Sequence, residues 1–193
     1  MMDLFKTWFM VGFDHILNVQ ALDHILFVLA LVVVYKPSMV KQIVILITAF
    51  TIGHSITLIL SALDLISYNQ KVIEFLIPLT IVLTALNNII NRNKVITKAV
   101  TANYFIALVF GLVHGLGFAN YLKALLFKGN IILELFSFNV GIELAQLVVV
   151  GVFLIISFIG SNYIFKTREN WIFFVSSAIF GISLMLTLNA KFW

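Results

Sequence analysis

Long apolar runs, separated by short polar stretches, set the pattern of this chain. A helix needs about 20 apolar residues to cross the hydrocarbon core of a bilayer, and most of the runs reach or approach that length. The pattern therefore predicts an all-α, polytopic membrane helix bundle with six transmembrane helices, in a single integral membrane domain that covers residues 1–193. The predicted spans are about 22–35, 40–63, 71–90, 99–119, 131–160 and 171–188.

The stretch before the first run, residues 1–20, predicts a short N-terminal helix. Apolar residues recur there at helical spacing, but the stretch is too short and too polar to span, so we expect a re-entrant or amphipathic helix. The first ten residues lack the basic start and long apolar core of a removable signal peptide, so none is expected. Only about 15 Å of helix separates Asp23 and His24 from the end of the first run, so this pair should lie below the membrane surface, where the N-terminal helix could cover it.

Composition narrows the class of protein. Hydrophobic residues make up 62% of the chain and charged residues 10%, which is typical of an integral membrane protein. Since six spans take up most of the length, no second, soluble domain is expected. The net charge of +4 comes from basic residues in the polar gaps, where they face anionic lipid, so nucleic acid is not an expected partner. There is no cysteine. A metal ion would therefore have to be bound by nitrogen and oxygen ligands.

Basic residues in alternate loops predict an orientation. The side richer in lysine and arginine is usually cytoplasmic, which places both termini outside, in a bacterial inner membrane. Seven basic residues fall on one side and five on the other; they are Lys36, Lys41, Arg92, Lys94, Lys98, Lys166 and Arg168 against Lys6, Lys71, Lys123, Lys128 and Lys191.

Polar side chains inside the runs gather in one half of the membrane. Ionisable residues at membrane depth are costly, and they usually face the interior of a bundle with a function there. Because successive spans run in opposite directions, each residue can be assigned to a half, and chance would divide them evenly. All of these fall in the half on the side of the N-terminus: Asp23, His24, His54, Glu74, His114, Asn139 and Glu143.

Three histidines and several carboxylates in one pocket of low dielectric constant predict a divalent cation. Imidazole nitrogen and carboxylate oxygen are natural ligands, and the ion's charge offsets that of the carboxylates. We expect His24, His54 and His114 as ligands, with Asp23 or Glu143 as a fourth ligand or as the acceptor that orients an imidazole. Nickel, cobalt and zinc all remain open. Further candidates are His15, Glu74, Asn139, Gln146 and Ser55.

Each residue also has a purely structural interpretation. A lone histidine in a span is more often a hydrogen-bond donor between helices than a metal ligand. Glu74 lies near a predicted interface, where it could be solvated. Gly111 and Gly115 are typical of helices that pack closely. The phenylalanines are expected to contact lipid and to fill the core.

Five motifs together resemble the HupE/UreJ family of membrane proteins. They follow one another from about residue 12 to residue 150, with one departure at Ala21, where a glycine is expected. The resemblance implies a membrane fold of six or seven helices and a role with nickel or cobalt, since such proteins are commonly regarded as permeases for these metals. The motifs are GFDHIL (12–17), DHILF (23–27), FTIGHSITL (50–58), FGLVHGLGFA (110–119) and FNVGIELAQ (138–146).

Three functions fit these observations. The first is a permease or accessory importer for nickel or cobalt, whose path onward would use the few polar residues of the inner half of the membrane. The second is an intramembrane zinc-dependent hydrolase, acting on a lipid or a membrane-anchored substrate through a metal-bound water. The third is a structural membrane subunit with a buried polar network. The polar residues of the inner half are Thr48, Thr51, Thr84, Asn87, Asn88 and Asn103.

Overall fold

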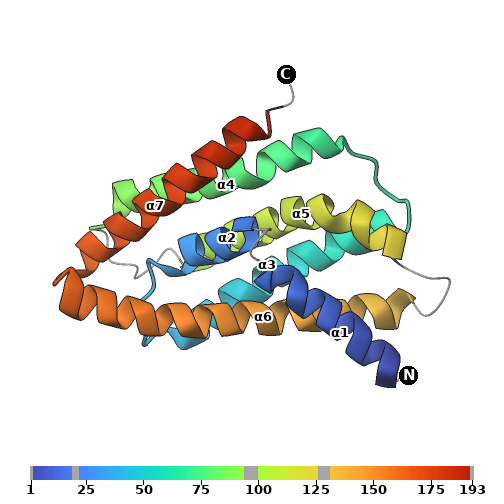
Figure 1. Cartoon of the computed structure of the whole chain (residues 1–193), viewed down its shortest axis with the longest axis horizontal. Coiled ribbons are helices and arrows are strands. Elements are labelled where there is room, and N and C mark those ends of the chain that lie inside the picture. Colours follow the sequence, from blue (N-terminus) through green and yellow to red (C-terminus); the bar gives the residue numbers. More distant parts are fainter. Residues whose placement is uncertain (1, 19–21, 94–99, 126–130, 192–193) are drawn as a thin grey trace.

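All regular elements in the described part of the chain are helical. The computed structural model describes residues 2–18, 22–93, 100–125 and 131–191 (Figure 1). The predicted all-α membrane bundle is confirmed, and its short N-terminal helix is α1. The elements are α1 (Met2–Leu17), α2 (Leu22–Val32), α3 (Val40–Ala62), α4 (Gln70–Asn91), α5 (Val100–Leu125), α6 (Ile131–Ile159), the π-helix η1 (Gly160–Ile164) and α7 (Arg168–Asn189).

Five helical segments in the described residues are long and apolar enough to cross a membrane: α3, α4, α5, α6 continued by η1, and α7. The predicted span over 22–35 corresponds to α2, which has 11 residues and is too short to cross alone. Helices α1 and α2 pass the same test only as one span bent by 72°. The sixth crossing is therefore present only if this bent pair is counted as a single span.

The helices pack as two close pairs and one outer pair. Helix α3 packs most extensively against α5, and α1 packs along α6. Helices α4 and α7 pack together, and Figure 1 shows them side by side along one edge of the bundle, with α1 crossing α6 at the opposite edge. Helix α2 lies inside, in contact with α4, α6 and α7. The short helix thus occupies the interior, where its first turn can meet the other helices.

Glycines bring the backbones of α3 and α5 into contact. A methyl group added at Gly53 would collide with the carbonyl oxygen of Leu108, and one added at Gly111 would collide with that of Phe50. One added at Gly115 would meet the backbone of α3 at His54. Small residues allow this approach, which stabilises membrane helix pairs by close van der Waals packing. These backbone contacts also fix the position of α5 along the axis of α3.

The same device joins α1 to α6. A methyl group at Gly12 would collide with the carbonyl oxygen of Phe138, and one at Gly141 with that of Phe9. Because α1 is held in this way, its last turn, which carries His15, is placed next to the first turn of α2. Glycine contacts in two helix pairs therefore position α1, α3 and α5, three of the four helices that carry a histidine.

Four residues used in the sequence analysis lie outside the described residues. They are Ala21, Lys94, Lys98 and Lys128. The departure from the family pattern at Ala21 and the full count of basic residues on each side thus remain observations on the sequence.

Candidate metal centre

Three histidines from three helices converge in the interior. His15 on α1, His24 on α2 and His54 on α3 each offer one ligand atom, and these atoms all lie within 4.8 Å of one another. The ring centroids of His15 and His24 are 4.5 Å apart, and each is 6.3 Å from that of His54. We call these three residues the histidine cluster. Residues distant in the sequence meet here, as the depth argument predicts for His24 and His54.

The nitrogens of the cluster are buried and lack partners. His24 is 5% exposed and His54 is fully buried. Nε2 of His15, Nε2 of His24 and both ring nitrogens of His54 have no hydrogen-bond partner among the described residues. Buried polar atoms are nearly always hydrogen-bonded, so each exception requires an explanation. Several exceptions at one point indicate a site that takes a ligand.

His114 lies beside the cluster and not within it. Its ring centroid is 5.7 Å from that of His24. Its Nδ1 lies 2.9 Å from the carbonyl oxygen of Phe110; since a carbonyl only accepts, the ring donates here and Nε2 keeps its lone pair. The sequence pattern predicts His114 as a ligand together with His24 and His54, and His15 as a further candidate. The structure groups His15 with them, because the 72° bend between α1 and α2 brings the end of α1 over the start of α2.

Asp23 orients His24. Its Oδ1 lies 3.2 Å from Nδ1 of His24, in the first turn of α2. A carboxylate in this position accepts the Nδ1 proton, fixes the ring and makes the other nitrogen a better donor to a metal. This geometry is compatible with the second of the two roles expected for Asp23, that of an acceptor behind an imidazole, which stays a prediction.

Glu143 and Gln146 bond to α3 further into the bundle. Thr48 donates to Glu143 at 2.6 Å, and Thr51 donates to Gln146 at 3.0 Å. Thr48 precedes His54 by six residues, or about 9 Å along the helix axis. Glu143 is thus hydrogen-bonded to Thr48 and not to a histidine nitrogen. The depth of Glu143 in the membrane, on which its prediction as a ligand is based, does not reveal this pairing.

The remaining candidates do not join the cluster. Glu74 is exposed and accepts a hydrogen bond from Gln70 at 3.1 Å. Ser55 donates to the carbonyl oxygen of Thr51 within α3. Asn139 donates to the carbonyl oxygen of Leu135, while its own Oδ1 is buried without a partner. Asn139 is the one of these three that leaves a buried polar atom free.

Phenylalanines enclose the histidines on two sides. On one side, the Phe118 ring lies 3.8 Å from His15 between centroids and stacks on Phe138 at 5.4 Å. On the other side, Phe27 and Phe50 lie 4.8 and 5.2 Å from His114. The sequence analysis assigned such residues to lipid contact and core. The signal that identifies several of them is a spacing of four residues from a histidine, as in Phe50 to His54 and Phe118 to His114.

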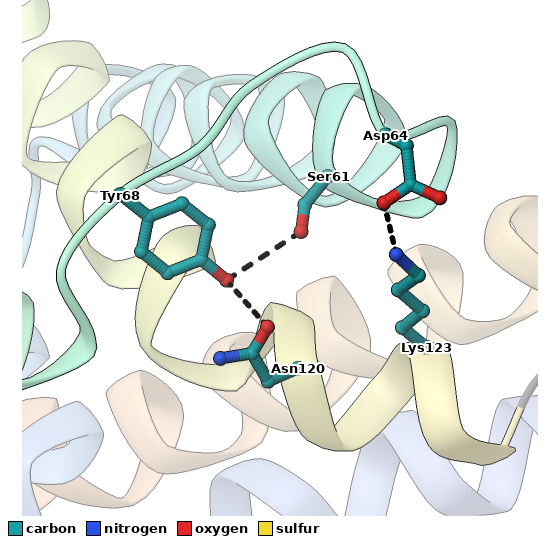
Figure 2. A network of polar contacts seen from close by, with 5 residues as sticks. All are labelled: Ser61, Asp64, Tyr68, Asn120 and Lys123. Atoms are coloured by element: carbon teal, nitrogen blue, oxygen red, sulfur yellow. Dashed lines mark hydrogen bonds and ion pairs between the residues drawn. The ribbon is translucent and has the colours of Figure 1, made fainter.

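A polar network holds the end of α5 above Phe118. Tyr68, in the α3–α4 loop, donates to Asn120 at 3.2 Å and lies 3.5 Å from Ser61, as Figure 2 shows. Lys123 pairs with Asp64 in the same view. Helix α5 is thereby tied to the α3–α4 loop on the side of the cluster where Phe118 covers His15.

Comparison with protein families decides the relationship. A family model described as HupE / UreJ protein matches residues 1–190. The chain belongs to the HupE/UreJ family. Neither a curated protein nor a solved structure matches it. In this HupE/UreJ protein, the motifs that carry the family resemblance supply all four histidines, and it is these motifs that the fold brings together.

Proposed function

We propose that this HupE/UreJ protein moves nickel or cobalt across the membrane, as a permease or accessory importer, and that the ion passes through the histidine cluster. The observation that carries the proposal is the set of buried, unpartnered imidazole nitrogens of His15, His24 and His54. The metal ion is the cargo in this proposal. The family match supports a membrane protein of this kind, and the cluster supplies the chemistry.

The spacing of the nitrogens suits one ion. Three nitrogens spread evenly around one ion, with bonds of about 2.1 Å, are about 3.6 Å apart. The ligand atoms lie within 4.8 Å of one another, so a shift of less than about 1 Å in each side chain would let all three bind the same ion. Imidazole suits nickel, cobalt and zinc, whereas magnesium and calcium prefer oxygen. A cluster of three imidazoles therefore favours the former group.

The phenylalanines on the two sides of the histidines support transport. Phe118 lies against His15, and Phe27 and Phe50, which form the second wall, lie against His114. Such side chains toward both faces of the membrane are expected of an occluded site in a carrier that opens one side at a time. Beyond the second wall lies a cavity of about 820 Å³, which reaches Phe110. Of the polar residues predicted to form the inner path, Thr84, Asn87, Asn88 and Asn103 line this cavity. We assign the cavity to the cytoplasmic side, with both termini outside in a bacterial inner membrane.

The two other functions fit less well. A structural polar network would satisfy its members with hydrogen bonds, whereas the cluster leaves four nitrogens without described partners. A zinc hydrolase also uses three protein ligands, but its substrate must reach the metal. His54 is fully buried and His15 lies beneath Phe118, so this arrangement favours a small ion over a lipid or peptide.

Metal content and uptake test the proposal together. Purified protein equilibrated with Ni²⁺ or Co²⁺ should retain about one ion per chain, and His54→Ala should retain less than a tenth of that. Ser176→Ala serves as the control, because Ser176 is buried and unpartnered on α7, outside the cluster; it should bind as the wild type does.

Proteoliposomes then separate carriage from mere binding. Wild-type protein should accumulate the ion inside vesicles, and His54→Ala should not. Equal retention of metal by His54→Ala and the wild type would contradict the cluster as the binding site. Stoichiometric binding without uptake would contradict the permease and leave a metal-binding role without transport.

A further inference from the structure

The cavity beyond Phe27 and Phe50 is lined by positive charges, whereas the histidine cluster offers electron pairs to a cation. The cavity has a volume of about 820 Å³ and is lined by residues from α2, α3, α4, α5 and α7 and from the segments next to them. Among the described residues, three basic side chains and one acidic side chain line it: Lys36, Arg92, Arg168 and Glu169. Three positive charges against one negative leave it cationic. A divalent cation would not be retained there, so the cavity can release an ion from the proposed path, but its charge calls for an anion as the resident occupant.

The three basic residues, which we call the cationic rim, lie at helix ends. Lys36 follows α2, Arg92 caps the C-terminus of α4, and Arg168 begins α7. Such positions in a membrane bundle fall at the boundary between hydrocarbon and headgroups. No described ion pair involves any of the three. Their charge is therefore available to an anion from outside the chain.

Arg92 and Arg168, two residues of the cationic rim, each contact a backbone carbonyl oxygen. Arg92 donates to the carbonyl oxygen of Ile89 at 2.9 Å, and its guanidinium lies 5.1 Å above the ring of Phe173. Arg168 approaches the carbonyl oxygen of Val33 at 3.5 Å. A guanidinium has five N–H donors, so each arginine keeps donors for a further partner. A positioned fork of this kind suits a phosphate group.

Below the rim the walls become apolar. Leu31, Val34, Leu46, Leu83, Ile106 and Ile172 line the cavity together with Phe110. Asparagine side chains near the rim, Asn87 and Asn91, are bonded to each other at 2.8 Å. A cationic mouth with amide groups, above an apolar interior, matches a molecule that has an anionic head and a hydrocarbon chain.

We propose that this cavity binds an anionic phospholipid, with its phosphate at the cationic rim and part of an acyl chain against the apolar walls. Basic pockets between transmembrane helices on the cytoplasmic side bind acidic headgroups of this type. The charge of the rim, its place at the boundary and the apolar depth all point to a lipid rather than a free anion. None of the histidines lines the cavity, so lipid binding can be measured without metal. The inference rests on the proposed function only for the assignment of this side as cytoplasmic.

Native mass spectrometry of the full-length protein in detergent tests the inference. The protein is titrated with dioleoylphosphatidylglycerol, with dioleoylphosphatidylcholine, which has the same chains and a zwitterionic head, and with water-soluble glycerol phosphate. We expect the anionic lipid to bind at least about ten times more tightly than either comparator.

Charge variants locate the site. Lys36→Gln and Arg168→Gln should each weaken binding of the anionic lipid about five-fold, since each basic residue near an acidic headgroup contributes to affinity by about that factor. Lys36 is exposed, so its substitution leaves the fold intact. Lys41→Gln is the matched control, because Lys41 is an exposed lysine at the start of α3, outside the cavity; it should bind as the wild type does.

Three results would overturn the inference. Equal binding of the zwitterionic lipid would show that the cationic rim has no role. Equal binding of glycerol phosphate would show an anion site that needs no acyl chain. A loss in Lys41→Gln as large as that in Lys36→Gln would show general attraction to a basic surface.

Discussion

The histidine cluster and the cationic cavity lie in one bundle but are built in opposite ways. Around the cluster, glycines let backbones touch, and His24 and His54 are buried while His15 is partly buried. Around the cavity, the ends of α2, α4 and α7 leave a volume of about 820 Å³ between them. The cluster presents lone pairs inward, whereas the cavity presents positive charges. The comparison teaches that close packing can gather buried donor atoms at one point, as the proposed cation site requires, while loose packing at the helix ends leaves the volume that the proposed lipid would fill.

The largest expected effect comes from disturbing the close packing. Gly53→Ala places a methyl group against the carbonyl oxygen of Leu108, so α3 and α5 must separate, at a cost of about 1–3 kcal/mol or more. Gly151→Ala is the matched control, because a methyl group there meets nothing within 4 Å, and alanine is favoured over glycine in a helix. Thermal unfolding in detergent should show a lower Tm for Gly53→Ala and an unchanged or higher one for Gly151→Ala. Equal Tm values would argue against backbone contact as the basis of the site.

A smaller effect distinguishes the histidines from one another. His15→Ala removes a member of the cluster, so nickel affinity should fall by about 100-fold or more. His114→Ala removes a neighbour that bonds the carbonyl oxygen of Phe110, and it should cost about ten-fold or less, the lower end of what partners behind metal ligands contribute. Isothermal titration with Ni²⁺ measures both. The reverse order would restore His114 to the place that the sequence analysis gave it.

The smallest effect is a difference in response to pH. A metal ion binds only deprotonated imidazoles, so binding releases protons, and acidification weakens it. Affinity for Ni²⁺ should fall by about ten-fold per pH unit for each proton displaced once the histidines begin to protonate. Binding of the anionic lipid at the cationic rim should stay constant from pH 8 to pH 6, since lysine and arginine remain charged there. Parallel titrations of both ligands give the comparison, and a pH-independent nickel affinity would exclude neutral imidazoles as the ligands.

The pattern of the sequence predicts much of the fold because each apolar run encodes its own helix. The helices α3, α4, α6 and α7 follow runs whose length and hydropathy are local properties of the chain. Helix α2 shows the limit of this reasoning. Its 11 residues form part of a crossing only in combination with α1, and the bend between the two helices depends on how α1 packs against α6.

For the candidate site too, the sequence predicts the position of some residues and not of others. His24 and His54 could be placed at a common depth from the direction of their spans, and the structure brings their rings within 6.3 Å. His15 could not be ranked, because its position depends on the angle at which α1 returns over α2. Glu143 was expected as a ligand or as the acceptor of an imidazole, from its depth alone. Depth along the membrane does not say to which side a residue points, and the structure shows Glu143 accepting a hydrogen bond from Thr48.

His54 differs from its neighbours in having no anchor. His24 is tethered at Nδ1 by Asp23, and His114 at Nδ1 by Phe110, so each of these rings has one nitrogen committed to carrying the proton. Neither nitrogen of His54 is committed. This imidazole keeps both tautomers open and can offer either of its two edges as an electron-pair donor. In the proposed transport, it is therefore the residue that we expect to release an ion on one side and accept the next from the other.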